Sequence, residues 1–120
     1  MTYPIRNNIG SFPTWLWRDE AEIINALITA CLKRGFMISV FDGEEWAVKK
    51  STKRAEIQKE VAATDETTFR VRDAEGEYVG FFWLIHGNRA HVVSDHTANE
   101  ICEAIWEEIE PVIDHWEAQA

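Results

Sequence analysis

His86, His91, Asp95 and His96 fall within eleven residues, and imidazole and carboxylate groups at such spacing can bind metals. A zinc site needs three or four ligands that converge at about 2 Å. On one strand, His91 and Asp95 share a face, whereas His96 lies on the other. The spacing therefore favours turn and surface roles. His91, Asp95 and His96 stay an alternative metal site, and neither a metal nor a cofactor is predicted.

Signatures of catalysis are absent from the sequence. It has no glycine-rich phosphate loop, no GxSxG elbow and no HExxH helix. Its carboxylate pairs, such as Glu44-Glu45 and Glu107-Glu108, are adjacent, so on regular elements they point apart. We therefore predict a non-enzymatic protein with no catalytic residues.

One basic segment, KKSTKR at residues 49–54, lies at the start of a predicted helix. Backbone N–H groups at a helix start bind anions, so Lys49, Lys50, Lys53 and Arg54 are candidate ligand-binding residues for a phosphate-containing compound. Two simpler interpretations stay open. The segment can be a solvated turn, or it can face the acidic C-terminal helix within the same fold.

The last predicted helix carries a line of carboxylates, which we call the acidic stripe. Its members follow one another at intervals of three or four residues, so they share one helix face. They are Glu100, Glu103, Glu107, Glu110, Asp114 and Glu117. Like charges at this spacing repel by about 0.2–0.5 kcal/mol per pair, so five successive pairs cost about 1–2.5 kcal/mol. The stripe is the candidate partner-binding surface.

Three uses of the acidic stripe are open: docking on a basic protein surface, imitation of nucleic acid, and internal pairing or plain solubility. The stripe offers one charge per ~5 Å of helix axis, whereas a DNA duplex presents one per ~1.7 Å. Close imitation of a duplex would therefore need further acids. The predicted partner is a basic protein surface, such as that of a nucleic-acid-binding host protein.

The elements that position these residues follow from hydrophobic periodicity. Apolar side chains recur at helical spacing from Ile23 to Cys31, and Gly35 sits where that helix should end. Residues 36–41 and 46–49 are predicted strands around an Asp-Gly hairpin turn. A second helix should follow and end near residue 63.

Three more strands and a helix complete the chain. The predicted strands cover residues 67–72, 78–86 and 90–94. Thr97 with Glu100 matches a capping box for the last helix, in which proline 111 should produce a kink or a restart. The order α-β-β-α-β-β-β-α, with short connections, predicts a single α+β domain over residues 1–120. Its antiparallel sheet has about five strands packed with helices.

The predicted strand YVGFFWLIH (residues 78–86) is apolar on both faces. Phe81 and Trp83 project to one side, and Phe82 and Leu84 to the other. Helices on both sides would cover it, and so would a partner or a second copy of the protein. A homodimer is therefore one open alternative.

Charge is distributed unevenly along the 120 residues, whose formal net charge is −9. Residues 90–120 hold 8 acids and no Lys or Arg, whereas residues 1–89 hold 13 acids and 12 bases. The acidic end disfavours direct binding of nucleic acid or of an anionic membrane. No apolar run could span a membrane, and the N-terminus lacks signal-peptide character, so a cytoplasmic location is predicted. Cys31 and Cys102 are then buried free thiols.

Four stretches extend over most of the chain, from about Phe12 to Thr97: EIINALITACLKRGFMISVFDGEEWAVKK, KRAEIQKEVAATDETTFRVRD, IHGN and SDHT. Together they resemble a group of small uncharacterised proteins from proteobacterial plasmids, phages and genomic islands. The group has no established activity, so the resemblance implies no catalytic residues. It implies a mobile-element setting, in which small acidic proteins often bind and block host defence proteins, anti-CRISPR and anti-restriction proteins among them.

We therefore predict a non-enzymatic binding protein: a mobile-element accessory inhibitor of a host nucleic-acid-handling or defence protein that acts through the acidic helix. Two alternatives remain. One is a small-ligand-binding domain that uses the basic segment 49–59, and the other is a histidine-based metal-binding domain.

Overall fold

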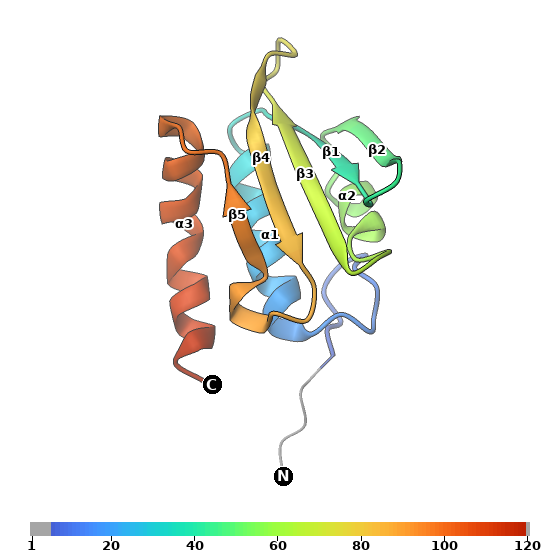
Figure 1. Ribbon diagram of the computed structural model, residues 1–120, viewed down its shortest axis with the longest axis vertical. Coiled ribbons are helices and arrows are strands. Elements are labelled where there is room, and N and C mark those ends of the chain that lie inside the picture. The colour runs from blue at the N-terminus through green and yellow to red at the C-terminus, as the bar shows by residue number, and fades with distance from the viewer. Residues whose placement is uncertain (1–5, 120) are drawn as a thin grey trace.

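The computed structural model describes residues 6–119, which form three α-helices, a short 3-10 helix and one five-stranded sheet (Figure 1). The helices are α1 (Arg18–Leu32), α2 (Arg54–Glu60), η1 (Arg89–His91) and α3 (Glu100–Glu117). The strands are β1 (Met37–Phe41), β2 (Trp46–Ser51), β3 (Glu66–Arg72), β4 (Tyr78–Ile85) and β5 (Val93–His96). This order confirms the predicted α+β arrangement. No helix in the described range is long and apolar enough to cross a membrane.

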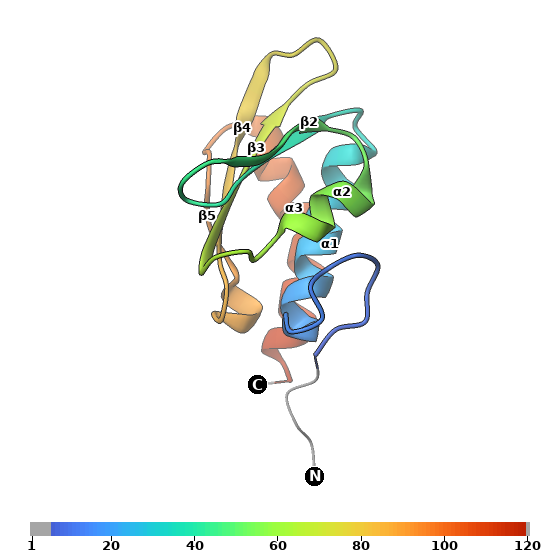
Figure 2. The ribbon, with the colours of Figure 1, turned by 90° about the vertical axis from the view of Figure 1, so that its right-hand side faces the viewer.

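The sheet has the order β2-β1-β3-β4-β5, and every neighbouring pair is antiparallel. Figure 2 shows all three α-helices on one side of the sheet. Figure 1 looks onto the other side, with α1 behind the strands and α3 beside β5 at one edge. One face of the sheet is thus covered by helices, and we call the other its open face.

Alternation of side chains along the strands decides what enters the core. The residues that face the helices are fully buried: Ile38 and Val40 on β1, Phe69 and Val71 on β3, and Phe82 and Leu84 on β4. They join one apolar cluster with residues of α1 and α3 such as Leu27 and Ile109. The side chains between them point to the open face. Strand β4 is therefore covered on one side only.

Two turns match the sequence prediction. Gly35 follows α1 with φ of +79°, the left-handed conformation expected after a helix. The β1–β2 turn is held by Asp42, whose Oδ1 accepts hydrogen bonds from the backbone N–H groups of Glu45 (2.8 Å) and Glu44 (2.9 Å). The same bonds hold the pKa of Asp42 below its usual value, because they stabilise its ionised form.

The start of α3 differs from the prediction, and the helix does not restart at Pro111. Asn99 caps the helix, since its Oδ1 accepts a hydrogen bond from the Cys102 N–H at 2.8 Å. The predicted cap, Thr97, instead accepts a hydrogen bond from the backbone N–H of Phe81 at 3.0 Å, so the capping-box prediction is wrong. The helix also continues as one element through Pro111, which lies on its exposed side.

The segment predicted as a strand at residues 90–94 starts within η1, and only its last two residues belong to β5, which extends over Val93–His96. The cause is the buried Glu20 carboxylate of α1. It accepts hydrogen bonds from the backbone N–H groups of Gly87 and Arg89, which draw this loop away from the sheet. Trp83 consequently pairs with Asp95.

Candidate functional site

The acidic stripe lies on the solvent side of α3, and all six of its members are exposed. Two of them contact histidines: Glu103 lies 2.8 Å from His96, and Glu117 lies 3.3 Å from His91. The other four form no ion pair with any cation between residues 6 and 119. The stripe is therefore a largely unneutralised anionic edge.

The two cations at the end of α1 pair with an acid outside the stripe. The Glu108 carboxylate forms ion pairs with the Lys33 ammonium at 2.7 Å and with the Arg34 guanidinium at 3.0 Å. The hydrogen bond from Lys33 is the main reason that the pKa of Glu108 is lowered. Internal pairing thus occurs on α3, but it leaves the stripe itself as charged as the sequence implies.

The basic segment 49–54 does not act as one unit. Arg54 turns inward and donates a hydrogen bond to Asn25 of α1 at 2.8 Å, and Lys53 is exposed at the start of α2. Lys49 and Lys50 belong to β2, at the edge of the sheet farthest from β5. The basic segment therefore does not face the acidic helix within the same fold, and that interpretation is wrong.

Lys49 and Lys50 line a hollow on the open face, which we call the basic pocket. It has a volume of about 200 Å³. Its lining consists of Ser39, Trp46, Lys49, Lys50, Arg70 and Arg72. No carboxylate lines it, and its four cations form no ion pair within the described chain. One third of the 12 Lys and Arg residues of the protein thus converge, unneutralised, on one hollow.

A β-bulge explains why two adjacent lysines reach the same hollow. Ile38 pairs with Ser51 and Val40 with Val48, so Lys49 and Lys50 together face the single residue between, Ser39. Lys50 takes φ of +48°, a conformation that is uncommon outside glycine. The Ser39 hydroxyl accepts the Lys50 N–H at 2.9 Å and so compensates for the interrupted strand pairing.

Aromatic side chains continue the open face on both sides of the basic pocket. They are Phe41, Trp46, Tyr78, Phe81 and Trp83, all partly or largely exposed. The Arg70 guanidinium lies between two of these rings, 5.3 Å from the centroid of Trp46 and 5.4 Å from that of Tyr78. Exposed aromatic rings beside unpaired arginines can stack on flat ligands and bind anionic ones.

The histidines have separate neighbours. His91 contacts Glu117, and the His96 ring stacks between Phe82 and Trp106 while its Nε2 contacts Glu103. Asp95 caps the backbone N–H of His96. Between residues 6 and 119 no group of three or more His, Cys, Asp or Glu residues could hold a metal ion. The structure therefore does not bring His91, Asp95 and His96 together.

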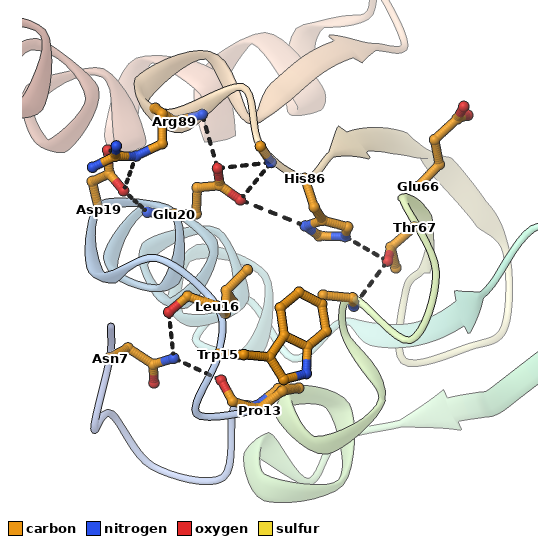
Figure 3. Close-up of polar contacts among 12 residues, drawn as sticks. Asn7, Pro13, Trp15, Leu16, Asp19, Glu20, Glu66, Thr67, His86 and Arg89 are labelled. Carbon is orange, nitrogen blue, oxygen red and sulfur yellow. Dashed lines mark hydrogen bonds and ion pairs between the residues drawn. The ribbon is translucent and has the colours of Figure 1, made fainter. Parts of the chain in front are cut away.

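A buried polar network joins α1 to the end of β4 (Figure 3). Glu20 is fully buried, and its Oε1 lies 3.8 Å from His86 Nδ1. On the other side of the ring, Nε2 lies 2.7 Å from the Thr67 hydroxyl, which accepts a hydrogen bond from the Ala62 N–H. The hydroxyl proton is then free to bond Nε2, whereas His86 Nδ1 is buried and has no hydrogen-bond partner among the described residues.

Glu20, His86 and Thr67 lie in a row in the structure and have the residue types of an acid–base–nucleophile relay. Thr67 is only 1% exposed, however, so a substrate cannot reach its hydroxyl. A neighbouring cavity of about 270 Å³ is lined by Glu20 and His86, together with Arg6, Trp15 and other residues. The network therefore serves to anchor the loop that follows β4, not to provide an accessible nucleophile.

Two of the four cations of the basic pocket were candidate ligand-binding residues from the sequence. Sequence reasoning singled out Lys49 and Lys50, but it grouped them with Lys53 and Arg54 by proximity in the chain. The missing members, Arg70 and Arg72, are on β3, where they alternate with core residues and so point to the open face. This alternation was visible in the sequence, but the pairing of β3 with β1 was not.

Comparisons with known protein families, with curated proteins and with solved structures find no match to this chain.

Proposed function

We propose that this protein is a non-enzymatic binding protein that holds a phosphate-bearing ligand in the basic pocket. The observation that carries the proposal is the convergence of four unpaired cations from β2 and β3 on one hollow. Unpaired cations of like charge repel one another, and an anion in the hollow would relieve this repulsion. Arginine and lysine together suit phosphate, which accepts bidentate hydrogen bonds from guanidinium groups.

The test is calorimetric titration with inorganic pyrophosphate at low salt. We expect binding that weakens about tenfold or more in Arg70→Gln, since a hydrogen bond to a charged group contributes about 1.5–3 kcal/mol. Lys59→Gln is the matched control, because Lys59 is exposed on α2 and removal of its charge leaves the pocket intact. Lys53→Gln should also bind normally. Equal losses in all three variants would show a diffuse charge effect and contradict the proposal.

A second candidate function rests on α3. The acidic stripe is exposed and mostly unpaired, and Ile101 beside it is 44% exposed, which is unusual for a large apolar side chain of a helix that packs on a core. An apolar group bordered by carboxylates suits docking on a basic protein surface. In a mobile-element setting the partner would be a host nucleic-acid-handling or defence protein, of the kind that anti-CRISPR and anti-restriction proteins block.

Affinity capture from host lysate tests this second function. The intact protein is compared with a variant that carries Glu103→Lys, Glu107→Lys and Glu110→Lys. We expect the intact form to retain a basic protein, and we expect the retention to fall with salt. If both forms retain the same proteins, the stripe is only a solvated face.

A further inference from the structure

We propose that the ligand of the basic pocket is a segment of single-stranded nucleic acid, whose phosphates lie among the four cations and whose bases stack on the aromatic rings of the open face. This inference rests on the proposed function, because it requires that the basic pocket bind phosphate. The inference specifies the chemical nature of the ligand beyond its phosphate group. Three features of the open face support it: the size of the pocket, the position of the rings and the direction in which charge is distributed.

The basic pocket is small for a free metabolite. Its volume of about 200 Å³ lies below the roughly 300–1,000 Å³ of typical small-molecule sites, which bury most of their ligand. It also lies on a sheet face that no helix covers (Figure 2). A small molecule held there would leave much of its surface in water. A polymer anchored by one phosphate could gain further contacts on the surrounding face.

Those further contacts are aromatic and lie across the strands. Tyr78, which is 48% exposed, and the half-buried Phe81 and Trp83 are on β4, three positions from β2 in the sheet. With strands about 4.8 Å apart, the backbone of β4 lies about 14 Å from that of β2. A stacked strand advances ~3.4 Å per nucleotide along its axis and an extended strand advances further, so a segment of at most about four nucleotides covers this distance.

Arg70 joins the two kinds of contact. Its guanidinium lines the basic pocket and lies within 5.4 Å of the ring centroids of both Trp46 and Tyr78. A cation between two aromatic faces can hold a phosphate while the adjacent bases stack on the rings, the combination by which proteins bind single strands without reading their sequence. In a duplex the base faces are already stacked, so the exposed rings would find no partner.

The acidic C-terminal end predicted no direct binding of nucleic acid, but that end lies away from the basic pocket. The acidic stripe is on α3, beyond the β5 edge, and the lysines are on the opposite edge strand, β2. Five strands are about 19 Å wide, more than twice the Debye length of about 8 Å at physiological salt. Acids of the β1–β2 and β3–β4 turns lie at opposite ends of the strands, so they favour a path across the sheet. Glu66 and Asp95, beside Trp83, limit this path on the side of β5.

The test is fluorescence anisotropy with labelled single-stranded DNA and RNA of about ten nucleotides, a length within the range of known single-strand sites. We expect Arg70→Gln and Tyr78→Ala each to weaken binding about fivefold to a hundredfold. The slope of log affinity against log salt should be shallower in Arg70→Gln and unchanged in Tyr78→Ala, which removes no charge. Lys59→Gln and Trp15→Ala, which change exposed residues outside the open face, should bind as the natural protein does.

Pyrophosphate separates this inference from the proposed function. Tyr78→Ala should keep its affinity for pyrophosphate, because Tyr78 does not line the basic pocket. If pyrophosphate binds but the oligonucleotides bind no more tightly, or if duplex DNA or polyglutamate binds equally well, the inference is wrong and the proposed function stands. If neither pyrophosphate nor oligonucleotides bind, both are wrong.

Discussion

Glu20 shows how a single buried residue can set the course of a loop. Its carboxylate is fully buried and has no Lys or Arg partner among the described residues. It is held by hydrogen bonds from the backbone N–H groups of Gly87 (2.9 Å) and Arg89 (2.8 Å). The neighbouring Asp19 pairs with the Arg89 side chain at 2.9 Å. Two acids that read in sequence as an ordinary first helical turn therefore fasten the loop after β4 to α1.

Replacement of Glu20 should be costly for stability. Glu20→Ala leaves the N–H groups of Gly87 and Arg89, which are only partly buried, without their carboxylate acceptor. Because water can reach them in part, each should cost about 1–2 kcal/mol, so we expect a loss of about 2–4 kcal/mol in the free energy of unfolding. Urea denaturation measures it. Glu75→Ala, which changes an exposed residue of the β3–β4 turn without an ion pair, is the matched control and should change stability by less than about 0.5 kcal/mol. Similar effects of the two substitutions would mean that Glu20 does not anchor the loop.

Burial also governs the two thiols. Cys31 and Cys102 are free and buried, as predicted. Burial raises the pKa of Cys31 from 9.0 to about 12, and it raises that of Cys102 as well. Because only the thiolate reacts, a rise of this size lowers the reactive fraction of Cys31 near neutral pH about a thousandfold. These cysteines are core residues, not reactive groups.

At the level of elements, α3 approaches the sheet at one glycine. An added Cβ at Gly80 of β4 would collide with the Cys102 sulfur and would also crowd Thr97. Gly80 does not have a positive φ, so space and not backbone conformation requires glycine here. Asn99 fixes the same junction, because its side chain donates a hydrogen bond to the Val79 carbonyl at 2.7 Å.

This close contact predicts coupling between two elements. Gly80→Ala should destabilise the protein by about 1–3 kcal/mol through overpacking. Cys102→Ala removes the sulfur in the way, so in the double variant the cost of Gly80→Ala should fall by at least about 0.5 kcal/mol. Urea denaturation of the four proteins in this double-mutant cycle gives the coupling. If the effects of Gly80→Ala and Cys102→Ala on the free energy of unfolding are strictly additive, α3 can move away from β4 at little cost and the contact is not tight.

Elements with a regular pattern were predictable from sequence, and their junctions were not. The alternation of Thr67 to Arg72 correctly located β3, because one buried face leaves a period-two pattern. Thr97 does not cap the helix, because its hydroxyl accepts a hydrogen bond from the N–H of Phe81, 16 residues earlier in the chain. Which donor meets a hydroxyl oxygen depends on tertiary structure. Only two of the four cations of the basic pocket were predicted, because the pairing of β3 with β1 also depends on tertiary structure.

On the scale of the whole molecule, negative charge accumulates at one edge of the fold. Since the acidic stripe is mostly unpaired, salt should stabilise the protein by screening repulsion within α3. The variant Glu107→Gln with Glu110→Gln removes three of the five repulsive pairs and should gain about 0.6–1.5 kcal/mol at low salt. Thermal unfolding across a salt series measures both effects. If the stability of the variant depends on salt as strongly as that of the natural protein, the repulsion does not arise from the acidic stripe.

Because of the bulge in β2, one of the cations in the basic pocket is supplied by a single additional residue. Val48 and Ser51 both face inward and are buried, and a regular strand would have a single outward residue between them. Lys50 is the additional one. Loss of its codon alone would restore an uninterrupted ladder, keep the core residues in place and take one cation out of the hollow. Gain or loss of a single codon in this edge strand would therefore change the number of cations in the hollow between three and four while the fold persists.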